Sequence, residues 1–473
     1  MWGHANPQRA AENRADSSII ARLVRSGAFA PQHPALTGAK RRDPTSIALV
    51  VVTFRRLASA DFSSQPVFGY YPMSSIFAAV ELAPRDPILG LTEAFNADTR
   101  ATKVNLGVGV YYDDNGKIPL LDAVKAAEKA RLETLPARGY QPIEGPASYN
   151  NAVQNLIFGA DAELLQAGRA VTIEALGGTG ALKVGADFLK RLYPSSTVYL
   201  SDPSWENHRA LFESAGFGVE NYPYYDAAGK CVNFTGMLAC LNSLPARGIV
   251  VLHACCHNPT GADLNAEQWR QVVDAVRARD LIAFIDMAYQ GFADGISEDA
   301  VALDLFAASG LQFLVSSSFS KSFSLYGERV GALTLVTASQ EESTRVLSQV
   351  KRVIRTNYSN PPTHGGAIVA TVLGNPALRQ QWENELAGMR DRIRAMRLAL
   401  VEKLQALGVA QDFSFVVKQR GMFSYTGLTA QQVERLKTEF GIYAVSTGRI
   451  CLAALNSKNI DYVAKAIAAV TKG

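Results

Sequence analysis

The feature that most constrains the fold is an alternation of short apolar runs and helical patterns between Ala175 and Val336. The runs are rich in Val, Ile and Leu, as expected of strands that are buried on both faces of a parallel sheet. They predict strands at 198–200, 249–252, 282–285, 313–316 and 331–336, with helices such as 181–192 and 267–279 between them. Because strands and helices alternate, the sequence predicts an α/β sheet with helices on both faces.

Beyond Pro376 the pattern changes. A long charged helix is followed by the hairpin-like segment Gly421–Gly427, another helix and the run Ile442–Leu455. This order of elements predicts a smaller α+β domain. A chain of 473 residues is long enough for one large and one small domain.

Residues 1–72 differ in kind from the rest of the chain. They are rich in Arg, Ser, Ala and Pro and show little periodicity, which predicts a disordered extension. Two alternatives stay open. The segment resembles an organelle transit peptide in composition, or translation begins at Met73 and the upstream residues belong to a mis-set start. A cytoplasmic location follows unless the segment is a transit peptide.

The distribution of charge argues against a nucleic-acid partner. Residues 1–72 hold nine basic and four acidic residues, whereas the remainder holds 38 basic and 39 acidic ones. The main body therefore has no broad positive surface for a polyanion. No apolar run approaches the roughly 20 residues of a membrane helix, so no membrane partner is predicted.

The cysteine and histidine content predicts a reducing compartment and no metal site. Five cysteines in a chain of this length do not form the pattern of a disulfide framework. The run His253–His257 contains two His and two Cys, but no second Cys/His pair completes a tetrahedral site.

Four segments carry residues suited to chemistry. The glycines of Leu176–Gly180 precede a predicted helix, whose free N–H groups suit a phosphate, although such a turn is also common as a structural element. Asn258–Gly261 follows a strand end, where α/β proteins bind ligands, but it is also ordinary loop sequence. Asp286 ends another apolar strand and needs a cationic partner, which a structural ion pair would also supply.

The segment Ser316–Gly331 is the most informative of the four. Lys321 lies among Ser, Phe and Gly with few charges nearby, so its amine is expected to be desolvated and its pKa lowered. A neutral amine can form a Schiff base with an aldehyde. Ser318 and Arg329 can both face one phosphate group, the guanidinium through two hydrogen bonds.

Together these segments resemble the class I aminotransferases, a branch of the fold-type I pyridoxal-phosphate enzymes, and in particular their aspartate/aromatic group. The resemblance extends from about Asp86 to the C-terminus. Its motifs are Ser318–Lys321, His257–Gly261, Asp286–Tyr289, Ser201–His208, Arg355–Pro362 and Thr447–Arg449.

The resemblance implies the fold and the reaction. The expected fold is type I, with a mostly parallel seven-stranded sheet in a large domain of residues 121–389. Residues 73–120 and 390–473 would form the small α+β domain. The implied reaction is ping-pong, pyridoxal-phosphate-dependent transamination between aspartate, glutamate or aromatic amino acids (tyrosine, phenylalanine) and 2-oxo acids such as 2-oxoglutarate.

The resemblance also assigns roles around the cofactor ring. Lys321 would form the Schiff base with the cofactor and later move the proton of the substrate Cα. Asp286 would pair with the pyridinium nitrogen, supported by His208 and His253. An ion pair at about 4 Å and an effective dielectric of about 20 is worth ~4 kcal/mol, enough to keep the pyridine protonated. Tyr289 and Asn258 would bond the phenolic oxygen, and Trp205 would stack on the ring.

The remaining implied roles concern phosphate, substrate and partner. The phosphate would be held by Gly178, Thr179, Ser318, Arg329 and the Tyr140 of a second subunit. The substrate α-carboxylate would be held by Arg449 with Asn258, Trp205 and Gly109, and a side-chain carboxylate by Arg355 of the second subunit. The resemblance therefore implies a homodimer with shared active sites.

The sequence does not choose between the two substrate groups. Tyr112 and Ile118 resemble the members that use aromatic amino acids, whereas Thr179 and Asn360 resemble those that use aspartate. Two other protein classes stay open. One is a regulator with a catalytically muted aminotransferase-like domain, and the other is a pyridoxal-phosphate lyase or decarboxylase. The two arginines, Arg355 and Arg449, favour transamination of dicarboxylates.

Overall fold

The computed structural model describes residues 75–83, 86 and 88–472. The predictions for residues 1–72 therefore lie outside the described residues. The chain divides into two units, Met1–Leu82 and Ala83–Gly473. The first unit contains a turn at 76–79 within its described part, and the second contains all the elements below.

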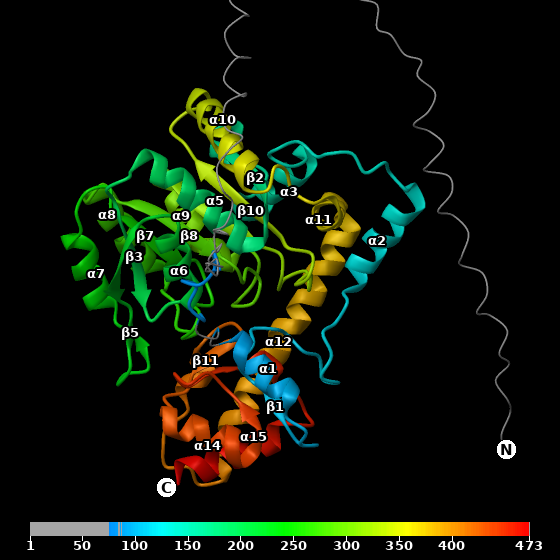
Figure 1. Ribbon diagram of the computed structural model, residues 1–473, viewed down its shortest axis with the longest axis vertical. Coiled ribbons are helices and arrows are strands. Elements are labelled where there is room, and N and C mark those ends of the chain that lie inside the picture. The colour runs from blue at the N-terminus through cyan, green and yellow to red at the C-terminus, as the bar shows by residue number, and fades with distance from the viewer. Residues whose placement is uncertain (1–74, 84–85, 87, 473) are drawn as a thin grey trace, which may run out of the picture. The chain divides into compact units, whose positions relative to one another are not determined.

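The core of the second unit is a seven-stranded sheet with the strand order β2-β10-β9-β8-β7-β3-β4 (Figure 1). Its strands, in chain order, are β2 (Ala170–Leu176), β3 (Thr197–Asp202), β4 (Gly218–Pro223), β7 (Ile249–His253), β8 (Ile282–Met287), β9 (Phe313–Ser318) and β10 (Val330–Val336). Strand β10 runs in the direction opposite to the other six strands of this sheet. The predicted mostly parallel α/β sheet is confirmed.

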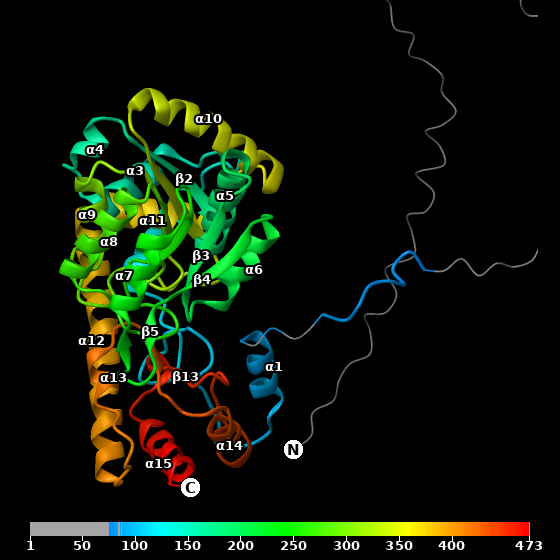
Figure 2. The same cartoon turned by 90° about the vertical axis from the view of Figure 1, so that its left-hand side faces the viewer.

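Helices cover both faces of this sheet (Figure 2). One apolar cluster joins the sheet to α5 (Gly177–Leu192), α6 (Glu206–Ser214) and α10 (Gln340–Asn357). The other joins it to α7 (Phe234–Ser243), α8 (Ala266–Ala278), α9 (Val301–Ala308) and the end of α3 (Ala147–Phe158). The interiors of β7, β8, β9 and β10 are buried on both faces, which explains their continuous apolar runs, whereas the edge strand β4 is mostly exposed.

The register of the sheet brings polar side chains to one edge. His253 of β7 lies opposite Asp286 of β8, and Asp286 lies opposite Ser316 of β9. These strands are parallel, so their carboxyl ends meet at the same edge of the sheet. The loops that follow them carry Asn258, Tyr289 and Lys321.

Smaller sheets also lie in the second unit, and one of them joins its N-terminal part to its C-terminal part. Strand β1 (Val104–Asn105) pairs in parallel with β12 (Ile442–Tyr443), and β11 (Phe423–Tyr425) pairs antiparallel with β13 (Arg449–Cys451). The hairpin predicted at Gly421–Gly427 is therefore wrong, because β11 finds its partner more than twenty residues later. A further pair, β5 (Tyr225–Asp226) and β6 (Cys231–Val232), extends from the large sheet region.

The remaining helices lie around these sheets (Figure 1). They are α1 (Leu89–Ala97), α2 (Asp122–Thr134), α4 (Glu163–Gln166), α11 (Thr363–Gly374), α12 (Pro376–Ala406), α13 (Phe415–Lys418), α14 (Ala430–Phe440) and α15 (Ile460–Thr471). One continuous apolar cluster contains residues of both predicted domains, from Val104 to Val470. The domain boundaries at 120 and 390 stay a prediction. Among the described residues, no helix combines the length and apolar character needed to cross a membrane.

The buried guanidinium of Arg397 connects α12 to the segment before β11. Its Nη1 donates to the carbonyl of Val416 (2.8 Å), and its Nη2 donates to those of Gly421 (2.8 Å) and Phe423 (2.6 Å). Burial lowers the pKa of Arg397 to about 10, which still leaves it charged near neutral pH. Strand β11 contributes Phe423 to the cleft described below, so the hydrogen bonds of Arg397 help to hold one wall of that cleft in place.

Replacing Arg397 with Met should destabilise the protein by at least about 3 kcal/mol, because several buried carbonyls lose their donor. Arg394→Met on the same helix is the control: this side chain is 44% exposed and pairs with Asp294 at the surface, so its loss should cost about 1 kcal/mol or less. Chemical denaturation monitored by circular dichroism measures both changes. Equal losses would show that Arg397 contributes nothing beyond surface pairing.

Candidate active site

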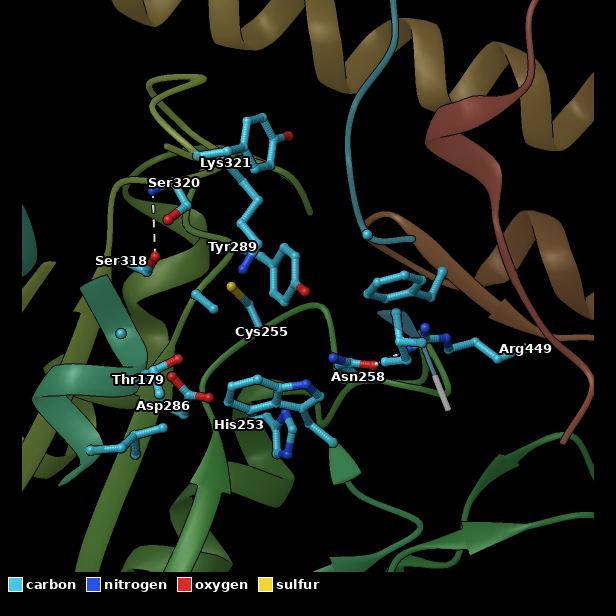
Figure 3. Close-up of a pocket in the computed structure, with 18 of the residues that line it drawn as sticks. Thr179, His253, Cys255, Asn258, Asp286, Tyr289, Ser318, Ser320, Lys321 and Arg449 are labelled. Atoms are coloured by element: carbon cyan, nitrogen blue, oxygen red, sulfur yellow. Dashed lines mark hydrogen bonds between the residues drawn. The ribbon is translucent and has the colours of Figure 1, made fainter. Parts of the chain in front are cut away.

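A cleft of about 250 Å³ opens at the carboxyl ends of the parallel strands. Figure 3 shows Arg449 and Asn258 on one side and Thr179, Ser318 and Ser320 on the other, with the side chain of Lys321 extending into the space between. Of the thirteen residues predicted from the sequence, eleven line this cleft. They are Gly109, Gly178, Thr179, Trp205, Asn258, Asp286, Tyr289, Ser318, Lys321, Arg329 and Arg449.

Asp286 is a buried carboxylate near the end of β8. Burial by itself would raise its pKa, but a hydrogen bond with His208 and the positive charge of Lys321 outweigh burial, so the pKa is lowered. The distance from His208 Nε2 to Asp286 Oδ2 is 3.0 Å. Because an ionised carboxylate can only accept, Nε2 of His208 carries the donated proton. Asp286 therefore presents a negative charge to the cleft near neutral pH.

A serine extends this pair into a chain of hydrogen bonds. Ser204 Oγ lies 3.0 Å from His208 Nδ1 and 3.1 Å from His253 Nε2. Burial lowers the pKa of His253 to about 3, with His208 as a smaller cause, so His253 is neutral. The structure thus brings both predicted supporting histidines toward Asp286, His208 directly and His253 through Ser204.

Lys321 follows β9 in a turn and is partly exposed to the cleft. Desolvation lowers the pKa of its amine to about 8; Arg329 adds to this effect and Asp286 opposes it. Its Nζ lies 4.7 Å from the centre of the Tyr289 ring. The amine is therefore partly neutral near pH 8, as the flanking Ser, Phe and Gly residues predict.

One end of the cleft is built to bind an anion. Gly178 and Thr179 lie in the first turn of α5, a helix of 16 residues whose N-terminus favours negative charge. Gly177 has φ +67°, and a β-carbon there would lie 2.6 Å from Nη2 of Arg329, so only glycine lets the guanidinium approach this turn. Arg329 also donates to Ser320 Oγ (3.3 Å). This end has the charge and donors for a phosphate group.

The opposite end holds a second cation, for which the described part of the chain supplies no carboxylate partner. Arg449 is 1% exposed and donates to Asn258 Oδ1 (3.1 Å) and to the carbonyl of Gly107 (2.7 Å). Its buried Nε has no acceptor among the residues that the structure describes. A buried, unpaired guanidinium is costly, so this end suits a carboxylate ligand.

Two predicted residues do not reach the cleft of this chain. Tyr140 is 97% exposed in the segment between α2 and α3. Arg355, in the last turn of α10, borders a separate cavity of about 320 Å³ together with Arg191, Lys351 and Arg352.

Among the residues that hint at specificity, Thr179 lines the cleft, Tyr112 is half-buried, Ile118 is 48% exposed and Asn360 donates to the carbonyl of Gln141.

The cleft also contains residues that sequence reasoning missed. Ser320 and Tyr326 belong to the segment around Lys321, so the signal was present there. Phe423 lies in the segment that was interpreted as a hairpin, and its ring lies 4.4 Å from the guanidinium of Arg449. Cys255 belongs to the run His253–His257, which was considered only as a metal site, and Ile88 had no distinguishing pattern around it. Ser204 lay within a quoted motif without an assigned role.

Comparison with known proteins identifies the family. A family model described as aminotransferase class I and II matches residues 101–467. The chain belongs to this family. The fold class, the pyridoxal phosphate cofactor and the aminotransferase activity predicted from the sequence are thereby confirmed.

Individual relatives of this aminotransferase carry two kinds of name. The aspartate aminotransferase of Pseudomonas aeruginosa is 69% identical over 396 residues, which cover 84% of this chain and all of that protein. The aromatic-amino-acid aminotransferase of Escherichia coli is 53% identical over 397 residues, again 84% of this chain and all of that protein. A crystal structure of the aromatic-amino-acid aminotransferase from Burkholderia pseudomallei, covalently bound to pyridoxal phosphate, is 68% identical with a TM-score of 0.83. It matches 84% of this chain and all of that one.

The lowered pKa of Lys321 predicts a stability effect in the cofactor-free aminotransferase. The folded state disfavours the protonated amine, which lowers the free energy of unfolding. This loss of stability is fully present below pH 8 and disappears as the pH rises past about 10.4, the pKa of the amine in the unfolded chain. Lys321→Met should therefore raise stability by about 3 kcal/mol at pH 7, at about 1.4 kcal/mol per pKa unit. Urea denaturation at pH 7 and pH 10 measures the gain. A gain that does not shrink at the higher pH would contradict the assigned cause.

Proposed function

We propose that this enzyme transfers amino groups from aspartate, glutamate and aromatic amino acids to 2-oxo acids, with pyridoxal phosphate bound at Lys321. The observation that carries the proposal is the placement of Lys321, Asp286 and Arg449 in one cleft. An amine of lowered pKa lies between an anion-binding end and a buried guanidinium that pairs with no carboxylate of residues 75–83, 86 and 88–472. The names of the relatives support both substrate groups.

The residues of the cleft fit the cofactor and its chemistry. Gly178, Thr179, Ser318 and Arg329 would hold the phosphate, Tyr289 and Asn258 the phenolic oxygen, and Trp205 would cover the ring. When bound, the cofactor supplies an aldehyde that condenses with amines and a ring that accepts electrons from the substrate Cα. Asp286 would hold a proton at the ring nitrogen, and the His208–Ser204–His253 chain would keep its carboxylate oriented.

Lys321 and Arg449 would act on the substrate. Arg449, with Asn258, Trp205 and the backbone at Gly109, would bind the α-carboxylate and so fix the position of Cα. The amine of Lys321 would then take the proton from the substrate Cα and deliver it to the cofactor carbon C4′. A base is most effective when its pKa lies near the working pH, and the pKa of Lys321 is about 8.

Adding aspartate alone to the cofactor-loaded enzyme should yield one oxaloacetate per site and convert the aldehyde absorbance of the cofactor to that of the amine. Lys321→Ala should slow this reaction by at least about 10²–10⁴-fold, because the proton carrier is lost. Lys183→Ala, which removes a lysine paired with Asp187 on α5, is the matched control and should react normally. Oxaloacetate production at the wild-type rate in Lys321→Ala would overturn the assignment. Binding of aspartate without any oxaloacetate in the wild type would favour a regulator.

We also propose that the active unit is a homodimer in which Tyr140 and Arg355 serve the site of the partner. Both lie outside the cleft of their own chain, and Tyr140 is almost fully exposed. The exposed apolar side chains of Leu132, in the last turn of α2, and Leu135, at the end of that helix, lie a few residues before Tyr140, and exposed apolar side chains favour an interface.

Mixing Lys321→Ala subunits with Arg355→Leu subunits should restore activity toward aspartate. In a mixed dimer, one site would combine an intact Lys321 with the intact Arg355 of the other chain. Steady-state rates before and after subunit exchange measure the recovery, which should approach one wild-type site per mixed dimer. Verified exchange without recovery would show that Arg355 does not serve the opposite site.

The pocket should use both substrate groups, with Arg355 important for only one of them. Arg355→Leu should lower kcat/KM for aspartate by about 100-fold or more, because a side-chain carboxylate loses its partner. The value for phenylalanine should change less than about tenfold, since its ring gains affinity from apolar burial. Arg352→Leu, on the same face of α10, is the control. Equal losses for both substrates would refute this division.

Finally, we propose a cytoplasmic location. All five cysteines lie in the described part of the chain and none of them forms a disulfide. Free thiols of this kind fit a reducing compartment. An organellar location remains the alternative if residues 1–72 act as a transit peptide.

A further inference from the structure

Glu174 is a buried carboxyl group that the proposed mechanism does not use. It lies in β2, three residues before Gly177, and is 2% exposed. Within the described ranges, 75–83, 86 and 88–472, it forms no ion pair, and no side chain or backbone group donates a hydrogen bond to its carboxyl oxygens. A buried carboxyl without a cation or donor is unfavourable when ionised.

Glu174 lies where two distant segments meet the sheet. Its backbone N–H donates to the carbonyl of Glu144 (2.9 Å), and its carbonyl accepts from the hydroxyl of Tyr358 (3.2 Å). The first segment follows Tyr140, and the second follows Arg355. A further hydrogen bond joins them directly, from Asn360 Nδ2 to the carbonyl of Gln141 (3.3 Å).

Two glycines make room for the Glu174 side chain. Gly145 has φ +85°, and a β-carbon there would lie 2.6 Å from Cβ of Glu174. A β-carbon at Gly366, in the first turn of α11, would collide with the carboxyl oxygen Oε1. The carboxyl group therefore lies tightly packed between α11 and the segment 140–145, called the Tyr140 segment below.

The groups that face this carboxyl from the surrounding elements do not neutralise its charge. Helix α3 contributes Tyr149, which donates to the carbonyl of Gly331, and the end of α10 contributes Tyr358. Nearby Lys351 is paired with Glu144 (2.6 Å), and His364 of α11 is directed toward Glu128 (3.9 Å). The β10 residue opposite Glu174 is Ala332.

Burial raises the pKa of Glu174 to about 8. Burial also raises the pKa values of Tyr149 and Tyr358, and the charge of Glu174 raises them further. Both phenols therefore stay neutral over the pH range in which Glu174 ionises. The folded protein therefore holds the proton on Glu174 more tightly than the unfolded chain does. The resulting penalty is absent below about pH 4.5, grows as pH rises and is fully present above about pH 8.

We propose that Glu174 is a positioning residue that, while protonated, packs the Tyr140 segment against the segment after Arg355, and that its ionisation loosens both. The inference rests on the proposed function, because Tyr140 and Arg355 matter to catalysis only if they reach the partner's site. Loss of the proton would place an unpaired charge between the two segments and push them apart. The enzyme would then bind dicarboxylate substrates less well in alkaline solution.

The test compares wild type with Glu174→Gln as cofactor-loaded enzyme between pH 6 and pH 9. Gln keeps the shape and cannot ionise, so its advantage in melting temperature should grow by roughly 3 °C over this range. The KM of the wild type for aspartate should rise about fivefold more than that of Glu174→Gln, with kcat nearly equal. Glu144→Gln, which removes a paired carboxylate from the same segment, should show no such widening.

A merely structural role would shift the melting temperature by a constant amount at every pH, and parallel curves would overturn the proposal. If Glu174→Gln does not fold, Glu174→Met gives the same comparison without a hydrogen-bonding group. The melting curves do not depend on catalysis. Absence of transamination in the wild type would therefore refute the proposed function while leaving the test of Glu174 intact.

Discussion

The active site depends on the placement of unlike charges in one cleft away from bulk water. Asp286 stays ionised because His208 donates to it and Lys321 lies nearby, despite a burial that favours the neutral form. Arg449 stays buried because Asn258 and Gly107 satisfy two of its nitrogens. Each charge is held by hydrogen bonds but is not fully neutralised. The cleft is thus prepared for a ligand that carries a cationic ring, a phosphate and a carboxylate.

The parallel sheet makes this arrangement possible. Strands β7, β8 and β9 end side by side, so His253, Asp286 and the turn before Lys321 meet although they are separated in sequence. The same geometry places the N-terminus of α5 near Arg329, where Gly177 leaves space for the guanidinium. Arg449 comes from a different sheet, whose partner strand β11 is attached to α12 through Arg397. Catalytic groups therefore depend on packing in both sheets.

Much of this could be predicted from the sequence because the relevant signals are local. Apolar runs identify five of the seven strands of the large sheet, and Lys321 and Asp286 lie directly beside such runs; β2 and the exposed edge strand β4 were not predicted. The resemblance to a known family supplied the roles that local patterns left open, such as those of Arg449 and Trp205. Long-range pairing was harder to predict: Gly421–Gly427 has the composition of a hairpin, but its strand pairs with residues 449–451. Ile88 and Phe423 enter the cleft through tertiary packing, for which single-sequence periodicity carries no signal.

The pairing of β1 with β12 has a consequence for synthesis on the ribosome. Val104 must find Ile442, and these residues are joined by a parallel pairing that local contacts cannot nucleate. The strands of the large sheet, from 170 to 336, are all made before β12 exists, so that sheet can form while synthesis continues. During that interval β1 has no partner, and Arg449 has not yet been added to the chain. The substrate end of the cleft is therefore the last part to be completed, because Arg449 emerges after the strands that position Asp286 and Lys321.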